Sequence, residues 1–450
     1  MTGASERQGR RVSTDRFTFW LAGIFLLCGL AVNVSLASFS PPGYAETTLD
    51  HTLGVLQGRS GDDSWGPMAL ALEYLEEVGT KPLYSALFFD IGIKYQYPPS
   101  ALFALEGLMQ FGPERVRIQD GITFENGPPI NDFLGWACIA IIAVAVWLIL
   151  EISLRQQHPS NNWNRWIIFR FLLCGAFTLT FYPVVKAFTL GQIQLWVDAL
   201  IALAVLAWVS GHRWMFGLLV GIAALIKPHM ALLLVWASMA GGWASVASGA
   251  VVIAFGLSAS ILAYGFENHI DYLKVLSFLG ERGEAFYPNQ SVNGLLNRSM
   301  SLYSPEEFRN ISAGEGPFPP YSSLVRWGTL LSSAAMLLAA MAFTLKSRDR
   351  TATLCVMLAA VTMASPVAWE HHYGVLLPAF AILAPRVVSS QPAILALVAA
   401  YLLLATYLDS AKLLASTMIN FLQTYMLVGG LIVCLISFWA AARDRWDGEV

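Results

Sequence analysis

Charge is scarce in this 450-residue chain, of which only 13% is Asp, Glu, Lys or Arg, against roughly 25% in soluble domains. The formal net charge is −3, so there is no basic stripe of the kind that binds nucleic acid, and we expect no nucleic-acid partner. The five cysteines lack metal-ligand spacing and fall within apolar runs, which indicates buried thiols. Apolar side chains are in excess, at 56% of the residues with a mean hydropathy of +0.57, and they predict a polytopic membrane protein.

Apolar runs long enough to span a bilayer recur along the sequence. The stretch 213–266 is almost continuously apolar and has room for three passes, with breaks at 227–229 and 241–245. Each pass must be helical, because lipid cannot satisfy free backbone groups. We therefore predict one all-α membrane domain over residues 1–450 with about 12 transmembrane helices. The other runs lie at about 17–39, 133–154, 166–188, 192–210, 323–345, 351–367, 372–388, 393–410 and 418–440.

Basic residues favour one side of this topology. With a cytoplasmic N-terminus, the inside segments hold 14 of the 27 Lys and Arg residues but only 7 of the 30 Asp and Glu residues, as the positive-inside rule requires. The sequence thus predicts cytoplasmic tails at 1–16 and 441–450 and outer loops at 40–131 and 267–322, in the inner (plasma) membrane. We interpret 17–39 as an uncleaved anchor, because it exceeds the apolar region of a signal peptide.

The first predicted outer loop contains two short helical stretches. "YPPSALFALEGLMQF" (97–111) is too short to span, and the prolines near its start suit a first helical turn. We expect it to lie on the outer leaflet or dip into it; if it crossed, the side of every later segment would invert. A second, amphipathic helix is predicted to begin at Pro67, with apolar and acidic faces.

Six polar clusters collect on the predicted outer face or near outer helix ends. Together they supply what a membrane enzyme needs: an exposed carboxylate, cations for an anionic leaving group, and amides for a polar substrate. A transporter is the rival interpretation, but it would bury ionisable groups at mid-membrane, where Asp198 is the one candidate inside a predicted span. The clusters are Asp62–Asp63, "KYQYPP" (94–99), "LGQIQ" (190–194), "IKPH" (226–229), "NQSVNG" (289–294) and "WEHHYG" (369–374).

Asp63 has two interpretations, a helix cap or a functional carboxylate. With Pro67 in the first turn, Gly66 or Ser64 is better placed to cap, which leaves Asp63 free in a loop above the helix. Lys227 also has two interpretations: it contacts the substrate, or its side chain extends out of the lipid at a helix end.

The paired histidines do not favour a metal site. His371 and His372 are adjacent and lack the i, i+4 spacing of a helical metal pair, so a role in hydrogen bonding or phosphate binding is expected. We predict no metal and no cofactor; a divalent ion held by Asp62 and Asp63 is the alternative. The amides of 289–294 suit either sugar hydroxyls or an ordinary outer loop.

The ordered set "KYQYPPSALF", "LGQIQLW", "IKPHMALLL", "NQSVNGLLNR" and "SPVAWEHHYGVLLP" resembles glycosyltransferase family 87 over about residues 60 to 390. These C-type membrane glycosyltransferases have known members that are polyprenyl-phosphate-mannose-dependent mannosyltransferases. The resemblance implies a multi-helix membrane fold, a lipid-phosphate sugar donor and a catalytic acid in the first outer loop. That acid falls on Asp62 or Asp63, and the histidine motif is implied to lie near the lipid phosphate or the acceptor.

The chemistry needs one carboxylate. A lipid phosphate leaves as a stabilised anion, so the second acid of a glycoside hydrolase can be dispensed with, and a base for the acceptor hydroxyl remains. We predict transfer of a sugar, expected to be mannose, from a polyprenyl phosphate to a lipid or glycan acceptor on the periplasmic face, with inversion. The alternatives are a transporter or flippase of a lipid-linked sugar and a non-catalytic polyprenyl-lipid binder.

Each predicted site residue has an assigned role. Asp63 is the proposed base, and Asp62 is its neighbour and the alternative base. Phosphate contacts are assigned to Lys227, His371 and His372, with Lys94 and Arg282 as further candidates; sugar hydroxyls to Gln192, Asn289, Gln290 and Asn293; and other substrate contacts to Tyr97, His229 and Glu370.

Overall fold

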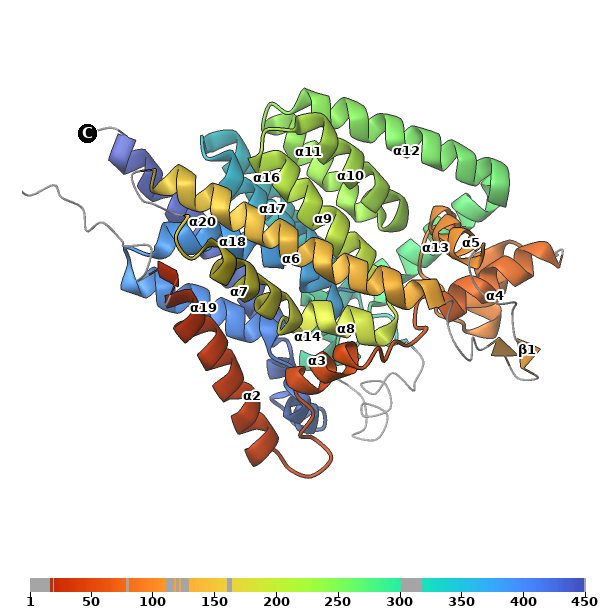
Figure 1. The fold of residues 1–450 in the computed structure, drawn as a ribbon. Helices are drawn as coiled ribbons and strands as arrows, with labels where there is room; N and C mark the ends of the chain where they lie inside the picture. The colour runs from red at the N-terminus through yellow and green to blue at the C-terminus, as the bar shows by residue number, and fades with distance from the viewer. Residues whose placement is uncertain are drawn as a thin grey trace, which may run out of the picture.

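The computed structural model describes residues 17–18, 20–77, 81–110, 117–118, 121–122, 129–159, 164–300 and 318–448. The predicted tail at 1–16 and parts of both predicted outer loops lie outside these ranges. Within them the chain is helical, as predicted, except for one antiparallel pair of two-residue strands, β1 (Arg117–Ile118) and β2 (Gly121–Ile122) (Figure 1).

Four helices in the described part of the chain are long and apolar enough to cross a membrane: α6 (Pro129–Gln157), α12 (Trp243–Tyr264), α16 (Ser323–Lys346) and α20 (Tyr425–Gly448). A fifth span is added if α7 (Ile167–Leu179) and α8 (Tyr182–Leu190) count as one broken span, since they meet at a bend of 57°. Pro183 lies in the first turn of α8 after an extended Phe181, which accounts for the bend. These helices support a membrane protein, and the figure of about 12 crossings stays a prediction.

Shorter helices fill the other predicted apolar runs. The two breaks predicted within 213–266 are confirmed, because α10 ends at Ile226 and α12 begins at Trp243. The shorter elements, with η marking 3₁₀ and π helices, are η1 (Leu21–Leu27), α2 (Cys28–Phe39), α9 (Gln194–Val209), α10 (Arg213–Ile226), η4 (Pro228–Ala231), α11 (Leu232–Met239), α17 (Arg350–Met363), η5 (Glu370–Leu376), α18 (Leu377–Val387) and α19 (Gln391–Ala405).

The segments between these helices form short elements of their own. The stretch predicted as a short helix at 97–111 forms η3 (Pro99–Ala101) and α5 (Leu102–Met109). The helix predicted from Pro67 is α4 (Trp65–Glu76), which begins two residues earlier; proline fits there because N–H groups of the first turn have no intrahelical partner. The remaining elements are α3 (Thr48–Leu56), η2 (Ser85–Ile91), α13 (Phe266–Arg282), α14 (Val292–Ser299), η6 (Asp409–Leu414) and η7 (Asn420–Gln423).

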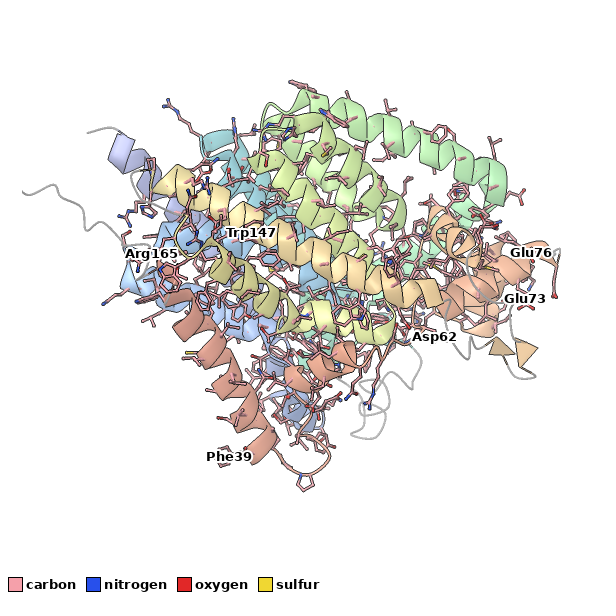
Figure 2. All side chains as sticks on the ribbon, viewed as in Figure 1. Phe39, Asp62, Glu73, Glu76, Trp147 and Arg165 are labelled. Atoms are coloured by element: carbon pink, nitrogen blue, oxygen red, sulfur yellow. The ribbon has the colours of Figure 1, made fainter. Side chains whose placement is uncertain are left out.

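The helices pack into one bundle. α6 lies against α9 and α18, α10 against α12, and α20 against α17 and α19. α17 is buried along its whole length after Arg350 except at Thr351, whereas α12 runs along one edge of the bundle in Figure 1 and leaves Phe255 and Leu262 uncovered. Phe39, at the end of α2, is likewise exposed and points away from the bundle in Figure 2. Such uncovered apolar side chains suit contact with lipid.

Candidate active site

The loop that carries Asp63 is joined by its backbone to the turn between α8 and α9. Gly61 N donates to Thr189 O at 3.0 Å, and Asp63 N donates to Leu190 O at 3.0 Å. Gly191 has φ +68°, and a Cβ there would stand 1.8 Å from Gly61 O, so only glycine fits this close approach. The junction holds Asp63 beside Gln192 although 129 positions separate them.

A side-chain network orients Gln192 toward Asp63. Ser64 Oγ and Tyr97 OH donate to Gln192 Oε1 at 2.8 and 2.7 Å, and Ser64 Oγ accepts from Ile193 N at 3.0 Å. With its oxygen engaged, the amide turns its Nε2 to donate to Asp63 Oδ2. No side-chain hydrogen bond caps α4. Asp63 is therefore held by Gln192 and does not cap the helix.

The Asp63 carboxylate lies where two cavities meet. The first has a volume of about 400 Å³ and the second about 560 Å³, both within the usual size of ligand sites. Asp63 is exposed to these cavities, yet protein surrounds its carboxylate. That burial raises the pKa of Asp63, the charge of Asp62 acts in the same direction, and the Gln192 hydrogen bond opposes them. A raised pKa makes this carboxylate a stronger base than an ordinary aspartate.

Nitrogen donors line one side of the first cavity. Lys227, between α10 and η4, brings its Nζ within 2.6 Å of His372 Nε2, and Lys94 and His229 line the same space. Apolar side chains from α11, α13, α16 and α17 line the same cavity: Leu232, Leu276, Leu279, Leu337 and Val361. This combination suits an anionic group attached to an apolar chain.

Trp369 lines the first cavity, and Glu284 contacts two of its lining residues without lining it; neither residue was predicted. Glu284 is buried, lies 3.6 Å from Lys94 Nζ and accepts from Trp369 Nε1 at 2.7 Å. Trp369 also lines the second cavity. A lone glutamate in "ERGEAFY" carries no distinctive pattern, whereas Trp369 stands within the predicted "WEHHYG" cluster and could have been named with it.

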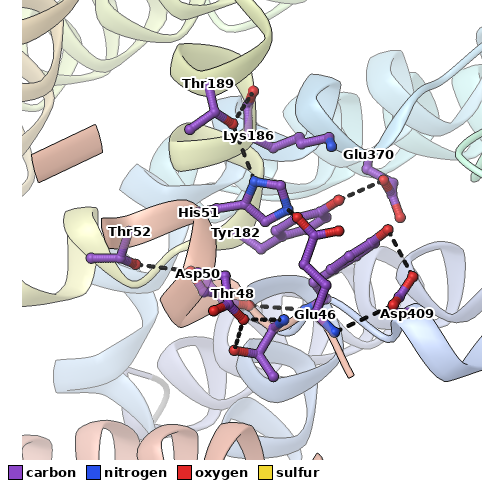
Figure 3. Close-up of polar contacts among 12 residues, drawn as sticks. Glu46, Thr48, Asp50, His51, Thr52, Tyr182, Lys186, Thr189, Glu370 and Asp409 are labelled. Carbon is purple, nitrogen blue, oxygen red and sulfur yellow. Dashed lines mark hydrogen bonds and ion pairs between the residues drawn. The ribbon is translucent and has the colours of Figure 1, made fainter. Parts of the chain in front are cut away.

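The second cavity carries both signs of charge. Glu46, Lys186, Glu370, His371 and Lys412 line it. Tyr182 OH donates to Glu370 Oε2 at 2.8 Å, and Glu46 Oε1 lies 3.4 Å from His51 Nε2 (Figure 3). Lys186 and Lys412 were missed; a lysine inside the apolar "FYPVVKAFTL" was the available signal for the first of them.

The predicted site residues divide into two groups. Asp63, Lys94, Tyr97, Gln192, Lys227, His229 and His372 line the first cavity, and Asp63, Glu370 and His371 line the second. Asp62, Arg282, Asn289, Gln290 and Asn293 line neither.

The three amides of the 289–294 cluster are used inside the fold. Asn289 Oδ1 accepts from Ala368 N at 3.0 Å, and Gln290 Nε2 donates to Gln423 O at 2.8 Å. Asn293 Nδ2 donates to Thr329 Oγ1 at 3.1 Å. Arg282 stacks on Phe278, 5.0 Å from its ring centre. The geometry therefore does not favour the sugar contacts predicted for these amides or the phosphate contact predicted for Arg282.

Metal ligands do not gather in the described residues, where no group of three His, Cys, Asp or Glu side chains is placed to share an ion. Lys227 instead offers an ammonium group that donates to His372 Nε2 and has further N–H donors for an anion, and Asp63 offers one carboxylate as a proton acceptor.

Comparison with known proteins gives a family match and a similar relative. Residues 131–367, more than half of the chain, match the model of glycosyltransferase family 87. Over 244 residues the chain is 32% identical to the polyprenol-phosphate-mannose-dependent alpha-(1-2)-phosphatidylinositol pentamannoside mannosyltransferase of Mycolicibacterium smegmatis. That match covers 53% of each protein, so the chain spans about half the length of this relative. Asp63 and His372 lie outside the family match, and their roles rest on the geometry.

Proposed function

Because the chain belongs to glycosyltransferase family 87, we propose that it transfers a sugar from a polyprenyl-phosphate donor to a hydroxyl group of a lipid or glycan acceptor. The M. smegmatis relative is named as dependent on polyprenol-phosphate-mannose, which supports mannose as the sugar. One observation carries the proposal: the Asp63 carboxylate, with its raised pKa, borders a cavity that pairs nitrogen donors with an apolar wall.

The first cavity is the proposed donor site. The lipid phosphate would lie against Lys227 and His372, whose nitrogens are 2.6 Å apart, with His229 and Lys94 nearby. The first isoprene units would lie along the leucines of α11, α13 and α16. Glu284 holds Lys94 at the cavity through an ion pair of 3.6 Å. A single phosphate would thus be met by several positive or neutral N–H donors without a metal ion.

The reaction is a single displacement. The acceptor hydroxyl oxygen attacks the anomeric carbon and forms the new glycosidic bond, while its proton passes to Asp63. The bond between that carbon and the phosphate oxygen breaks, and the phosphate leaves with the electron pair. Lys227, whose ammonium also donates to His372 Nε2, stabilises the negative charge that develops on it. One displacement inverts the anomeric configuration, and Asp63 then releases the proton to water.

The proposed location is the inner membrane, with cytoplasmic termini and the active site on the periplasmic face. The distribution of basic residues supports this orientation. Met418, which is 96% exposed, precedes α20 and lies at the outer end of the last predicted span, 418–440. In a cysteine-free background, a cysteine at Met418 should react with a membrane-impermeant maleimide in intact spheroplasts. Labelling only after lysis would reverse the orientation.

The test of activity uses the purified full chain in liposomes with labelled polyprenyl-phosphate-mannose and a lipid extract of bacterial membranes. We expect release of polyprenyl phosphate together with labelling of an acceptor, and loss of both in Asp63→Asn. Asp62→Asn is the matched control and should keep activity. Sugar that crosses the bilayer without bond cleavage would instead identify the chain as a flippase or transporter.

A further inference from the structure

We propose that the second cavity is the acceptor site, that it takes a neutral sugar ring at the end of the acceptor, and that Lys186 and Glu46 contact the ring hydroxyls. This inference rests on the proposed transferase function. It adds a binding site and a chemical class of acceptor.

The position of the cavity is the first support. Among the residues that line the two cavities, Asp63 and Trp369 line both. A base that removes the acceptor proton must touch the acceptor and also lie beside the reacting carbon of the donor. In a single displacement, the nucleophile and the leaving group occupy opposite sides of that carbon. If the phosphate is held in the first cavity at Lys227, the second cavity offers the acceptor a separate space that reaches Asp63.

The charge of the second cavity favours a neutral ligand. Glu46, Glu370 and Asp63 line it together with Lys186 and Lys412, and Lys412 is already paired with Asp409 at 2.7 Å. A phosphate or carboxylate would meet three carboxylates and one uncommitted cation, which like-charge repulsion disfavours. Sugar hydroxyls both donate and accept hydrogen bonds, so they match this mixture of carboxylates and ammonium groups.

Unused hydrogen-bonding capacity is the second support. Lys186 Nζ makes no ion pair or hydrogen bond with any residue that the structure describes, and it lies 5.7 Å from the ring centre of Tyr407. His371 is 2% exposed, and its Nε2 has no hydrogen-bond partner within the described part of the chain. Figure 3 shows Lys186 on the same side of the His51 ring as Glu370. Buried polar groups are normally satisfied, and a bound acceptor would supply the missing partners.

The cavity also offers apolar faces. Tyr44, Phe286 and Trp369 line it and are each partly exposed, whereas Tyr407 is 1% exposed and covered by Lys186. The carbon–hydrogen face of a sugar ring can lie on such aromatic surfaces while its hydroxyls turn to the polar side chains. The acceptor hydroxyl nearest Asp63 would then lose its proton, attack the anomeric carbon and displace the phosphate.

The test separates acceptor binding from donor binding. Purified full-length protein is supplied with labelled polyprenyl-phosphate-mannose and a panel of neutral octyl hexopyranosides, each also prepared as its 6-phosphate. We expect at least one neutral hexoside to be glycosylated and its 6-phosphate to be at least about tenfold poorer. Lys186→Met and Glu46→Gln should raise the KM for that hexoside about tenfold, as loss of a charged hydrogen bond does, with the donor KM changed by less than about twofold.

Lys81→Met is the matched control, because Lys81 is 62% exposed, pairs with Asp90 and lies outside both cavities. It should leave both KM values unchanged. The site assignment is wrong if Lys186→Met and Glu46→Gln raise the donor KM while sparing the acceptor KM. The neutral class is wrong if the 6-phosphates are the better acceptors, or if no neutral hexoside is accepted while a membrane extract is labelled. Failure of the wild-type protein to cleave the donor with any acceptor would defeat the transferase function itself.

Discussion

Gln192 and Asn289 are both buried amides in polar loops between helices, and they use their side chains differently. The side-chain oxygen of Gln192 accepts hydrogen bonds from Ser64 and Tyr97, and its nitrogen donates to Asp63 at the edge of a cavity. Asn289 donates to Glu284 O and Pro366 O at 2.9 and 3.2 Å, and its oxygen accepts from Ala368 N at 3.0 Å. One amide serves a carboxylate, and the other serves the backbone.

A polar motif such as the 289–294 loop can support a site without contacting the substrate. Asn289 forms a β-bridge with Trp369, and Gln290 N donates to Ala368 O at 2.7 Å. The 289–294 loop therefore fixes the segment that carries Trp369 and the histidines. An amide whose hydrogen bonds all go to main-chain groups stabilises the fold around the site. Gln192 instead hydrogen-bonds Asp63, the proposed reacting group.

The largest expected effect is at Asp63. Asp63→Asn should lower kcat about 10³-fold, the usual contribution of a general base. The same variant should keep or gain thermal stability at pH 7. Since the folded-state pKa of Asp63 is raised, its stabilising effect is present below the unfolded pKa and is lost as pH rises through the folded pKa, so the ionised form disfavours folding. Transfer of labelled sugar and a melting curve in detergent measure both; a kcat within tenfold of wild type would exclude Asp63 as the base.

Lys227 should show the next largest effect. Lys227→Met removes the ammonium group that lies 2.6 Å from His372 Nε2, and loss of one transition-state donor costs about 10²-fold in rate. We expect kcat/KM for the donor to fall by about that factor, with partial recovery in Lys227→Arg. Lys81→Met, at an exposed ion pair, is the control. A Lys227→Met enzyme with wild-type kcat/KM would leave Lys227 with only a snorkelling role.

Substitution of Asn289 and Gln192 should distinguish an amide that stabilises the fold from one that supports activity. Asn289→Ala removes the hydrogen-bond partner of the Ala368 N–H and of the Glu284 carbonyl, so we expect a loss of about 2 kcal/mol in unfolding free energy, measured as a lower melting temperature. Its kcat per folded molecule should stay within about threefold. Gln192→Ala should do the reverse, because it removes a hydrogen bond to Asp63, and lower activity with a smaller loss of stability. Equal losses of activity in both variants would contradict the different roles assigned to Asn289 and Gln192.

Local patterns predicted the helices well. Every predicted apolar run contains a helix, and the breaks within 213–266 lie where "KPH" and "GGWAS" were interpreted as interruptions. The 57° bend between α7 and α8 was not predicted, because a hydropathy pattern gives no information on the angle between consecutive helical segments. Lys186 was missed for the same reason: within a straight 166–188 span it would be one lysine in lipid, and only in bent α8 does it line a cavity.

The site was predicted in part. Single charged or aromatic residues in polar clusters, such as Asp63, Lys227 and His372, do meet at one cavity. The neutral amides were indistinguishable in sequence, because whether Gln192 or Asn289 faces a cavity depends on contacts between segments far apart in the chain. Glu284 and Lys412 were beyond prediction for that reason as well. Glu284 contacts Trp369, which is distant in the sequence, and Lys412 lines the second cavity beside residues from distant segments.

The smallest expected effect tests which aspartate is the base. The charge of Asp62 raises the pKa of Asp63, so Asp62→Asn should lower that pKa. Asp63 must be ionised to accept a proton, and activity therefore falls as pH drops through its pKa. The acid limb of kcat/KM in Asp62→Asn should move to lower pH by a fraction of a unit, with a similar plateau near neutral pH. Asp62→Glu keeps the charge and should keep the wild-type limb. If Asp62→Asn loses activity at every pH while Asp63→Asn does not, the base is Asp62, and the junction with Gln192 only positions its neighbour.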